Sequence, residues 1–246
     1  MKTKFFLAVL IYISTAELVI LRNLKLGFLL HSLFLIGVPV IVISMSFEDE
    51  ISKLLMALSF LPLMRILEIL LPLDALDFLE RIMLFYSLLF VALVLFYRSF
   101  GGIGKIFRFK GSEYLSLGIL FGIALGFLEY LILKPEVVEP INTKTLSLSL
   151  AVFFLTGLTE ETLFRGFIQN FAQKLFSKRS SLIYANLAFV IVYISFLNPL
   201  ELLFVFTVGM IIGKIYQKTL NLFLVSVIHG SINFCLFVVA PILFAS

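Results

Sequence analysis

The sequence is poor in charged residues. Only 14% of its 246 residues are Asp, Glu, Lys or Arg, whereas an ordinary soluble domain has about 25%. Hydrophobic residues make up 61% of the chain, and the mean hydropathy is +1.15. Because so few charged side chains cannot cover a surface that faces water, a lipid bilayer is the solvent that fits this composition. The sequence therefore predicts an integral membrane protein.

Cysteine and tryptophan are almost absent: the chain has one Cys, Cys235, and no Trp. A single cysteine excludes an intrachain disulfide. The net charge of +4 is spread over separate loops, as membrane topology requires, so we expect membrane lipid and no nucleic acid among the partners. The basic residues 1–4 and the apolar run after them lack a good cleavage site. We therefore expect the first segment to be retained as a helix.

Alternation of polar and apolar residues, the pattern of a membrane β-barrel, is also missing. The apolar stretches are continuous, and helices satisfy their backbone hydrogen bonds in hydrocarbon. Since one span needs about 20 residues, the length predicts an all-α, polytopic transmembrane helix bundle of about eight spans. We expect one integral membrane domain over residues 1–246. The expected spans are residues 5–21, 26–47, 78–97, 114–133, 146–171, 181–196, 200–216 and 222–244.

The stretch 51–73 is apolar but ambiguous, because it contains Pro62, Arg65, Glu68 and Pro72. Proline removes a helix hydrogen bond and bends or ends the helix. Two interpretations stay open: a kinked span, or a helix that enters and leaves the membrane on one side.

Loop charges predict the orientation of the later spans. Residues 98–110, 174–179 and 214–218 are rich in Lys and Arg, and basic loops face the cytoplasm. The loop 134–144 and the C-terminus at Ser246 would then lie outside.

Glycines recur every four residues at Gly118, Gly122 and Gly126, and again at Gly209 and Gly213. Small residues at this spacing allow a neighbouring helix to approach closely. We interpret both patterns as helix packing, with a substrate groove as the alternative. The chain has no internal repeat of the kind from which many transporters are built.

Ionisable residues within a span cost at least about 2.5 kcal/mol at the helix centre, so those that occur there need an explanation. Glu17 and Arg22 lie near predicted helix ends, and we expect their side chains to reach the membrane edge. Glu129 lies one turn from the loop at Lys134 and is expected to be solvated or paired. His31, which lies within the second span, is expected to be a packing residue.

A first polar cluster lies at residues 159–167, after the apolar run that begins at residue 146. Glu161 and Arg165 are four residues apart, a spacing that favours an ion pair on a helix. Glu160 is turned about 100° away from Glu161 and has no local partner. A carboxylate in such a place is suited to take a proton from water.

A second polar cluster, His229 and Asn233, lies in the last span. The two residues share one face of a helix, where an imidazole and an amide can hold a metal, a water or a developing oxyanion. Both clusters have a structural alternative, which is polar contact between helices.

The order of these motifs resembles the CPBP intramembrane protease family, which includes the CAAX prenyl endopeptidases of the Rce1 type. The matching residues are Glu160, Glu161 and Arg165, then His229 and Asn233. The sequences 164–167 and 209–222 are similar as well, and the family-like core extends over about residues 146–240. The resemblance implies a CPBP/Rce1-like helical core and an intramembrane endopeptidase of the cell membrane. It also implies a hydrophobic or lipidated peptide substrate.

The resemblance also implies a role for each site residue. Glu160 would activate a water molecule, Glu161 would support it, and Arg165 would hold the glutamates. His229 and Asn233 would bind and polarise the scissile carbonyl group. A zinc ion with Glu160 and His229 among its ligands is the metal-dependent alternative, although zinc sites usually have three protein ligands.

The sequence departs from the family pattern at one motif, Phe-x-x-x-His. Its histidine should fall at or beside Ser195, but the chain has only His31 and His229. A serine is a poor ligand for a transition metal. A catalytically impaired relative that binds a hydrophobic or lipidated peptide is therefore the alternative to an active protease. A small transporter is a third hypothesis, based only on the buried glutamates.

Overall fold

The protein is helical throughout the part of the chain that its computed structural model describes, and this part contains no strand. Seven helical segments are long and apolar enough to cross a membrane, which confirms the predicted transmembrane helix bundle. The chain is therefore a multi-pass membrane protein. The described residues are 2–45, 49–71, 76–99, 114–136 and 142–244. The seven segments are Thr3–Ile20, Leu24–Ser44, Phe78–Ser99, Leu115–Leu133, Thr143–Leu175, Pro199–Thr219 and Leu222–Phe244.

The chain divides into two compact units. Unit 1 consists of Met1–Leu71 and Leu163–Gly213, and unit 2 of Pro72–Thr162 and Lys214–Ser246. The single domain over residues 1–246 and the core at about 146–240 stay predictions.

Each unit has its own set of helices. Those of unit 1 are α1 (Lys2–Ile20), α2 (Leu24–Met45), α3 (Asp49–Leu58), α4 (Phe60–Leu70), the π-helix η4 (Thr162–Gln169), α8 (Asn170–Leu175), α9 (Lys178–Val192), the short η5 (Ile194–Phe196) and α10 (Pro199–Thr219) as far as Gly213. Those of unit 2 are α5 (Phe78–Ser99), α6 (Leu115–Leu133), α7 (Thr143–Glu161), α11 (Leu222–Phe234), η6 (Cys235–Val239) and α12 (Ala240–Phe244).

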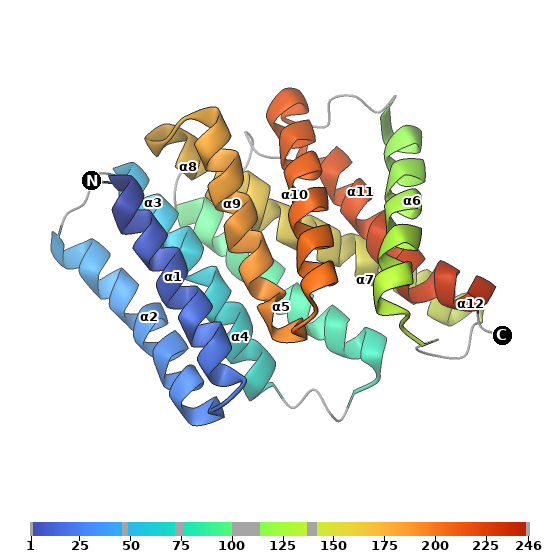
Figure 1. Cartoon of the computed structure of the whole chain (residues 1–246), viewed down its shortest axis with the longest axis horizontal. Helices are drawn as coiled ribbons and strands as arrows, with labels where there is room; N and C mark the ends of the chain where they lie inside the picture. The colour runs from blue at the N-terminus through green and yellow to red at the C-terminus, as the bar shows by residue number, and fades with distance from the viewer. Residues whose placement is uncertain (1, 46–48, 72–75, 100–113, 137–141, 245–246) are drawn as a thin grey trace. The chain divides into compact units, whose positions relative to one another are not determined.

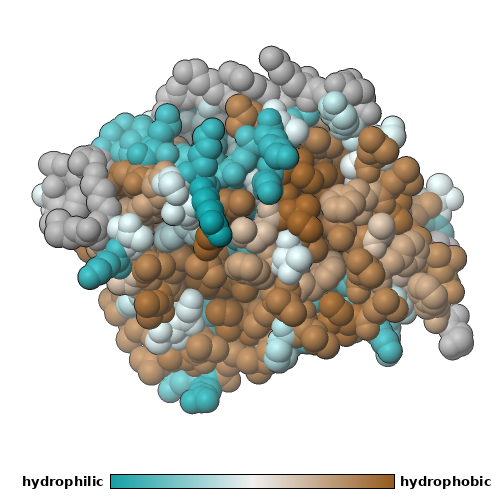
Figure 2. All heavy atoms as spheres, turned by 45° about the horizontal axis from the view of Figure 1, so that its top comes forward, coloured by the Kyte–Doolittle hydropathy of each residue, from teal (hydrophilic) through white to brown (hydrophobic). Residues whose placement is uncertain are grey.

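In unit 1, α1 and α2 form a helical hairpin and lie side by side (Figure 1). Phe6 and Ile13 of α1 are fully buried. The hydroxyl of Tyr184 on α9 donates a hydrogen bond to the Phe6 carbonyl oxygen at 3.2 Å. Several apolar side chains of α2 are exposed, including Ile43 at 80%. Exposed apolar surface is expected where a helix faces lipid, and Figure 2 shows such surface over much of the face that it displays.

The described part of the ambiguous stretch 51–73, which ends at Leu71, forms two short helices, α3 and α4, separated only at Ser59. Pro72 lies outside the described residues. Pro62 explains the interruption, because it has no N–H to donate to the carbonyl of Leu58 in the preceding turn. With 10 and 11 residues, each helix is about half as long as a span requires. The predicted span 181–196 corresponds to α9, which has 15 residues.

The predicted orientation stays a prediction. Residues 100–110 of the basic loop 98–110, residues 137–141 of the loop 134–144, and Ser246 lie outside the described residues.

In unit 2, α11 packs against both α6 and α7, and α5 packs against α7. A Cβ atom placed on Gly122 of α6 would lie 2.4 Å from the carbonyl oxygen of Ile228 and 2.6 Å from the Cβ of Ser231. Only a residue without a side chain permits this approach. The glycines of α6 therefore serve helix packing, as their spacing predicts.

Candidate active site

A crossing of α7 and α11 builds the site in unit 2. A Cβ atom on Gly157 would lie 2.6 Å from the carbonyl oxygen of Ser226 and 2.7 Å from the backbone nitrogen of Gly230. A Cβ atom on Gly230 would in turn lie 3.0 Å from the carbonyl oxygen of Phe153. The two helix backbones therefore touch, because each has a glycine where the other approaches. Glu160 and Glu161 follow this crossing on α7 by one turn, and His229 precedes Gly230 on α11.

The imidazole of His229 lies between the two glutamates. Its Nδ1 is 2.8 Å from Oε1 of Glu161, and its Nε2 is 3.5 Å from Oε2 of Glu160. The exposed fraction is 3% for Glu160, 0% for Glu161 and 5% for His229. The structure thus brings together three of the five predicted site residues, which are distant in sequence, at a buried position. Buried charges of this kind need compensating partners, and each carboxylate has the imidazole beside it.

A further residue contacts this group. Tyr86 of α5 donates a hydrogen bond from its hydroxyl to Oε1 of Glu160. Tyr86 is not among the residues predicted from the sequence, because it is 74 positions from Glu160 and lies in an apolar run among other aromatic residues. One sequence signal could have indicated Tyr86. It is a tyrosine, with a polar hydroxyl, within a predicted span of a chain whose commonest aromatic residue is Phe.

Asn233 lies one turn after His229 on α11 and is half-buried. Its side chain makes no hydrogen bond with another described residue. The role of Asn233 at an oxyanion therefore stays a prediction based on its helix face.

Arg165 belongs to unit 1, where it is buried. Its Nη2 donates to the carbonyl oxygen of Gly209 at 3.2 Å, and its guanidinium lies 4.7 Å from the ring centroid of Phe189. These two contacts join η4 to α10 and α9. The ion pair predicted with Glu161 assumed an α-helix. The residues after Glu161 form a π-helix, whose wider turn changes which residues are neighbours, and that ion pair stays a prediction.

The side chains around His229 do not form the ligand set that a zinc ion usually needs. Among the described residues, no three His, Cys, Asp or Glu side chains are placed to hold one metal ion. The Nδ1 of His229 is at hydrogen-bond distance from Glu161, which leaves Glu160 and His229 as a pair of candidate ligands. A catalytic zinc usually takes three protein ligands.

The comparison with protein families agrees with this geometry. Residues 142–235 match the family model described as type II CAAX prenyl endopeptidase Rce1-like. This matched segment, 94 of the 246 residues, is similar to the Rce1-like family. The matched segment includes all five predicted site residues, whereas Tyr86 lies outside it. No curated protein and no solved structure matches the chain significantly.

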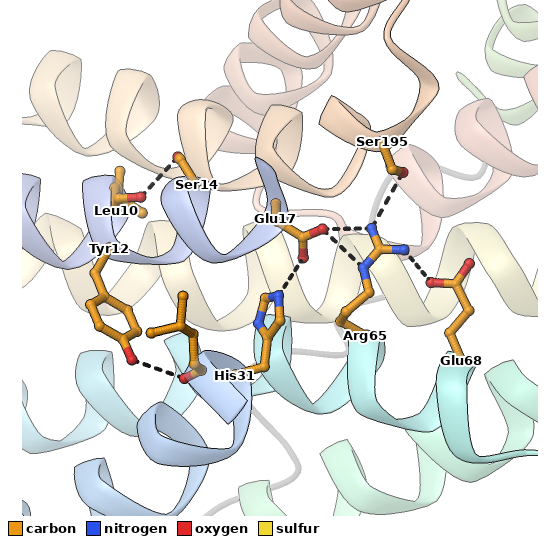
Figure 3. A network of polar contacts seen from close by, with 9 residues as sticks. Leu10, Tyr12, Ser14, Glu17, His31, Arg65, Glu68 and Ser195 are labelled. Atoms are coloured by element: carbon orange, nitrogen blue, oxygen red, sulfur yellow. Dashed lines mark hydrogen bonds and ion pairs between the residues drawn. The ribbon is translucent and has the colours of Figure 1, made fainter. Parts of the chain in front are cut away.

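Ser195, where the resemblance to the family predicts a histidine, lies in η5 of unit 1. Its hydroxyl accepts a hydrogen bond of 3.3 Å from Nη2 of Arg65 on α4 (Figure 3). The hydroxyl is therefore part of a second polar network, within unit 1.

Glu17 of α1 is the centre of this network. It is only 2% exposed, so the expectation that it reaches the membrane edge is wrong. Its Oε2 accepts from Nε of Arg65 at 2.9 Å and lies 2.7 Å from Nη2 of the same residue. Arg65 also pairs with the more exposed Glu68 at 2.6 Å. The side chains of Glu17, Arg65, Glu68 and Ser195 converge in Figure 3. The buried ion pair of Glu17 and Arg65 thus joins α1 to α4.

His31 and Glu129 are buried as well. His31 is fully buried, as expected for a packing residue, and its Nε2 is 3.6 Å from Oε1 of Glu17. Glu129 of α6 is 6% exposed, so a solvated carboxylate is excluded and a paired one remains.

Proposed function

We propose that this chain is an intramembrane endopeptidase of the cell membrane, in which Glu160 activates the water that hydrolyses a peptide bond. The single observation that supports this proposal is the position of His229 between Glu160 and Glu161, all three buried. The match of this segment to the Rce1-like family supports a peptidase.

The first step of the proposed reaction is proton transfer from water to Oε2 of Glu160. The hydroxide formed adds to the scissile carbonyl carbon and gives a tetrahedral oxyanion. A carboxylate base and a polar site for the oxyanion are the parts that this chemistry needs. In this proposal Asn233, one turn after His229 on α11, donates its amide to the oxyanion.

The second step is cleavage of the carbon–nitrogen bond. The proton held by Glu160 passes to the leaving amine, so that the products are a carboxylic acid, which ionises in water, and an amine. Glu161 accepts a hydrogen bond from Nδ1 of His229 and so directs Nε2 towards Glu160. A carboxylate that fixes the tautomer and orientation of an imidazole is a common device in hydrolases.

As substrate we propose a hydrophobic or lipidated peptide. Glu160 and Glu161 lie in one helical segment that is long and apolar enough to cross a bilayer, a setting that suits a hydrophobic peptide. The name of the matching family, a CAAX prenyl endopeptidase, supports a lipidated C-terminal tail as the first peptide to test.

Mass spectrometry of peptide products tests this function. Purified protein in lipid nanodiscs is incubated with prenylated and unprenylated peptides in water enriched in oxygen-18. Hydrolysis predicts one new carboxyl group that carries one oxygen from the solvent, and Glu160→Gln abolishes it. Cleavage that persists in Glu160→Gln contradicts the assignment of the base.

The alternative function is peptide binding without cleavage. The observation in its favour is Ser195, which occupies the place of a histidine and is hydrogen-bonded to Arg65. This alternative predicts that the wild type cross-links a photoreactive hydrophobic peptide without cutting it, and that Ser195→His creates activity. Cleavage by the wild type excludes it.

A further inference from the structure

Glu160 has a partner that lies outside the Rce1-like segment. Tyr86 is on α5, the helix that packs against α7 in unit 2. Its hydroxyl donates to Oε1 of Glu160, and its ring makes an edge contact with Phe85 at a centroid distance of 5.1 Å. The N-terminal half of unit 2 therefore contributes directly to the surroundings of the proposed base.

The two oxygens of Glu160 have different surroundings. Oε1 accepts the hydrogen bond from Tyr86, whereas Oε2 is 3.5 Å from Nε2 of His229. A hydrogen bond to a carboxylate is a strong one, and it holds the carboxylate plane in one orientation. We assign proton transfer to Oε2, the oxygen that faces the imidazole.

A structural role for the ring alone would not require the hydroxyl. The chain has 29 Phe and 8 Tyr residues, so packing in these spans is mostly done by phenylalanine. A hydroxyl without a partner is costly in an apolar setting. The placement of Tyr86 beside Glu160 gives its hydroxyl an acceptor, and gives Glu160 a donor.

We propose that Tyr86 is a positioning residue for Glu160: its phenol holds Oε1, so that Oε2 takes the proton from water. This inference rests on the proposed function, and it extends the site to a residue outside the family match. Tyr86 acts through Glu160 and does not itself contact the reacting atoms.

The variant Tyr86→Phe tests the role, because it keeps the ring and removes the hydroxyl. Tyr97→Phe, the same change on the same helix, is the matched control. We expect Tyr86→Phe to lower kcat roughly 10- to 100-fold, the effect of one lost hydrogen bond to a charged group, with KM changed less than about twofold. Tyr97→Phe should resemble the wild type in each respect.

Infrared difference spectroscopy provides a readout that does not need activity. The carboxylate band of Glu160 is identified by its disappearance in Glu160→Gln, and Tyr86→Phe should shift it while circular dichroism shows unchanged helicity. If the wild type cleaves no peptide, the proposed function fails, but the band shift still tests the contact. An unshifted band, or a Tyr86→Phe variant with the wild-type kcat, overturns the proposal. The proposal is also overturned if Tyr86→Phe lowers kcat, changes KM by more than twofold and reduces the helicity, because the hydroxyl would then be structural.

Discussion

Gly157 of α7 and Gly230 of α11 are in backbone contact, and this contact places Glu160 and Glu161 next to His229. A Cβ atom on Gly157 would come within 2.6 Å of the Ser226 carbonyl oxygen, a separation at which backbone atoms must move. The distance between the two helices, and with it the geometry of the proposed site, depends on the absence of a side chain at Gly157.

We expect Gly157→Ala to destabilise the protein by about 1–3 kcal/mol, the usual cost of overpacking, and to lower peptide cleavage. Unfolding in detergent, followed by circular dichroism, measures the stability. Gly37→Ala on α2 is the matched control, because a Cβ atom there meets nothing within 4 Å. Equal stability of the two variants would contradict the close crossing.

The pair Glu161 and His229 should act as one unit. Glu161→Gln is expected to lower kcat roughly 10- to 100-fold, because the neutral amide no longer fixes the imidazole as the carboxylate does. A double-mutant cycle with His229→Gln measures the coupling, and residues in contact are expected to be non-additive. Strictly additive losses would show that the two side chains act separately.

The buried pair Glu17 and Arg65 in unit 1 should matter for stability. Removing one partner of a buried pair costs about 3–5 kcal/mol, because a charge is left without compensation, so Arg65→Met is expected to lower the unfolding free energy by that order. The double variant Glu17→Gln with Arg65→Met should recover part of the loss.

The control for this pair is Lys53→Met on α3. Lys53 pairs with Asp49, whose side chain is 75% exposed, and exposed pairs contribute about 0–1 kcal/mol. If Arg65→Met costs no more than Lys53→Met, the ion pair in unit 1 has no structural importance.

Cleavage should be insensitive to chelators, because the donors around His229 provide no three-ligand site for zinc among the described residues. The measurement compares initial rates with and without 1,10-phenanthroline, followed by readdition of zinc. Loss of activity that zinc restores would show that a metal takes part.

The helical fold and much of the candidate site follow from the sequence. Apolar runs of span length predict the helices, and the residue order predicts that Glu160 and His229 belong to one site. Their contact depends on Gly157 and Gly230, which fit one another only once α7 and α11 are packed. Local patterns report what lies within one helix, and not which helices meet.

The failures have the same physical origin. Tyr86 is one hydroxyl in an apolar helix, and its acceptor lies 74 residues away. Glu17 looked like a helix-end residue, and its partner Arg65 is 48 residues further along. The ion pair of Glu161 and Arg165, argued from α-helical spacing, stays a prediction, and the sequence did not show that the chain turns to a π-helix at Thr162. Long-range partners and a local change of helix type are decided by tertiary packing.

The central claim is that Glu160 is the base of a peptide-hydrolysing site. The most direct measurement is the kcat for one purified peptide in wild type, Glu160→Gln and the control Glu129→Gln, which changes a second buried carboxylate of unit 2. We predict that Glu160→Gln lowers kcat by at least roughly 100-fold, the usual contribution of a general base, while Glu129→Gln stays within about threefold of wild type. Cleavage by Glu160→Gln at the wild-type rate would contradict the claim.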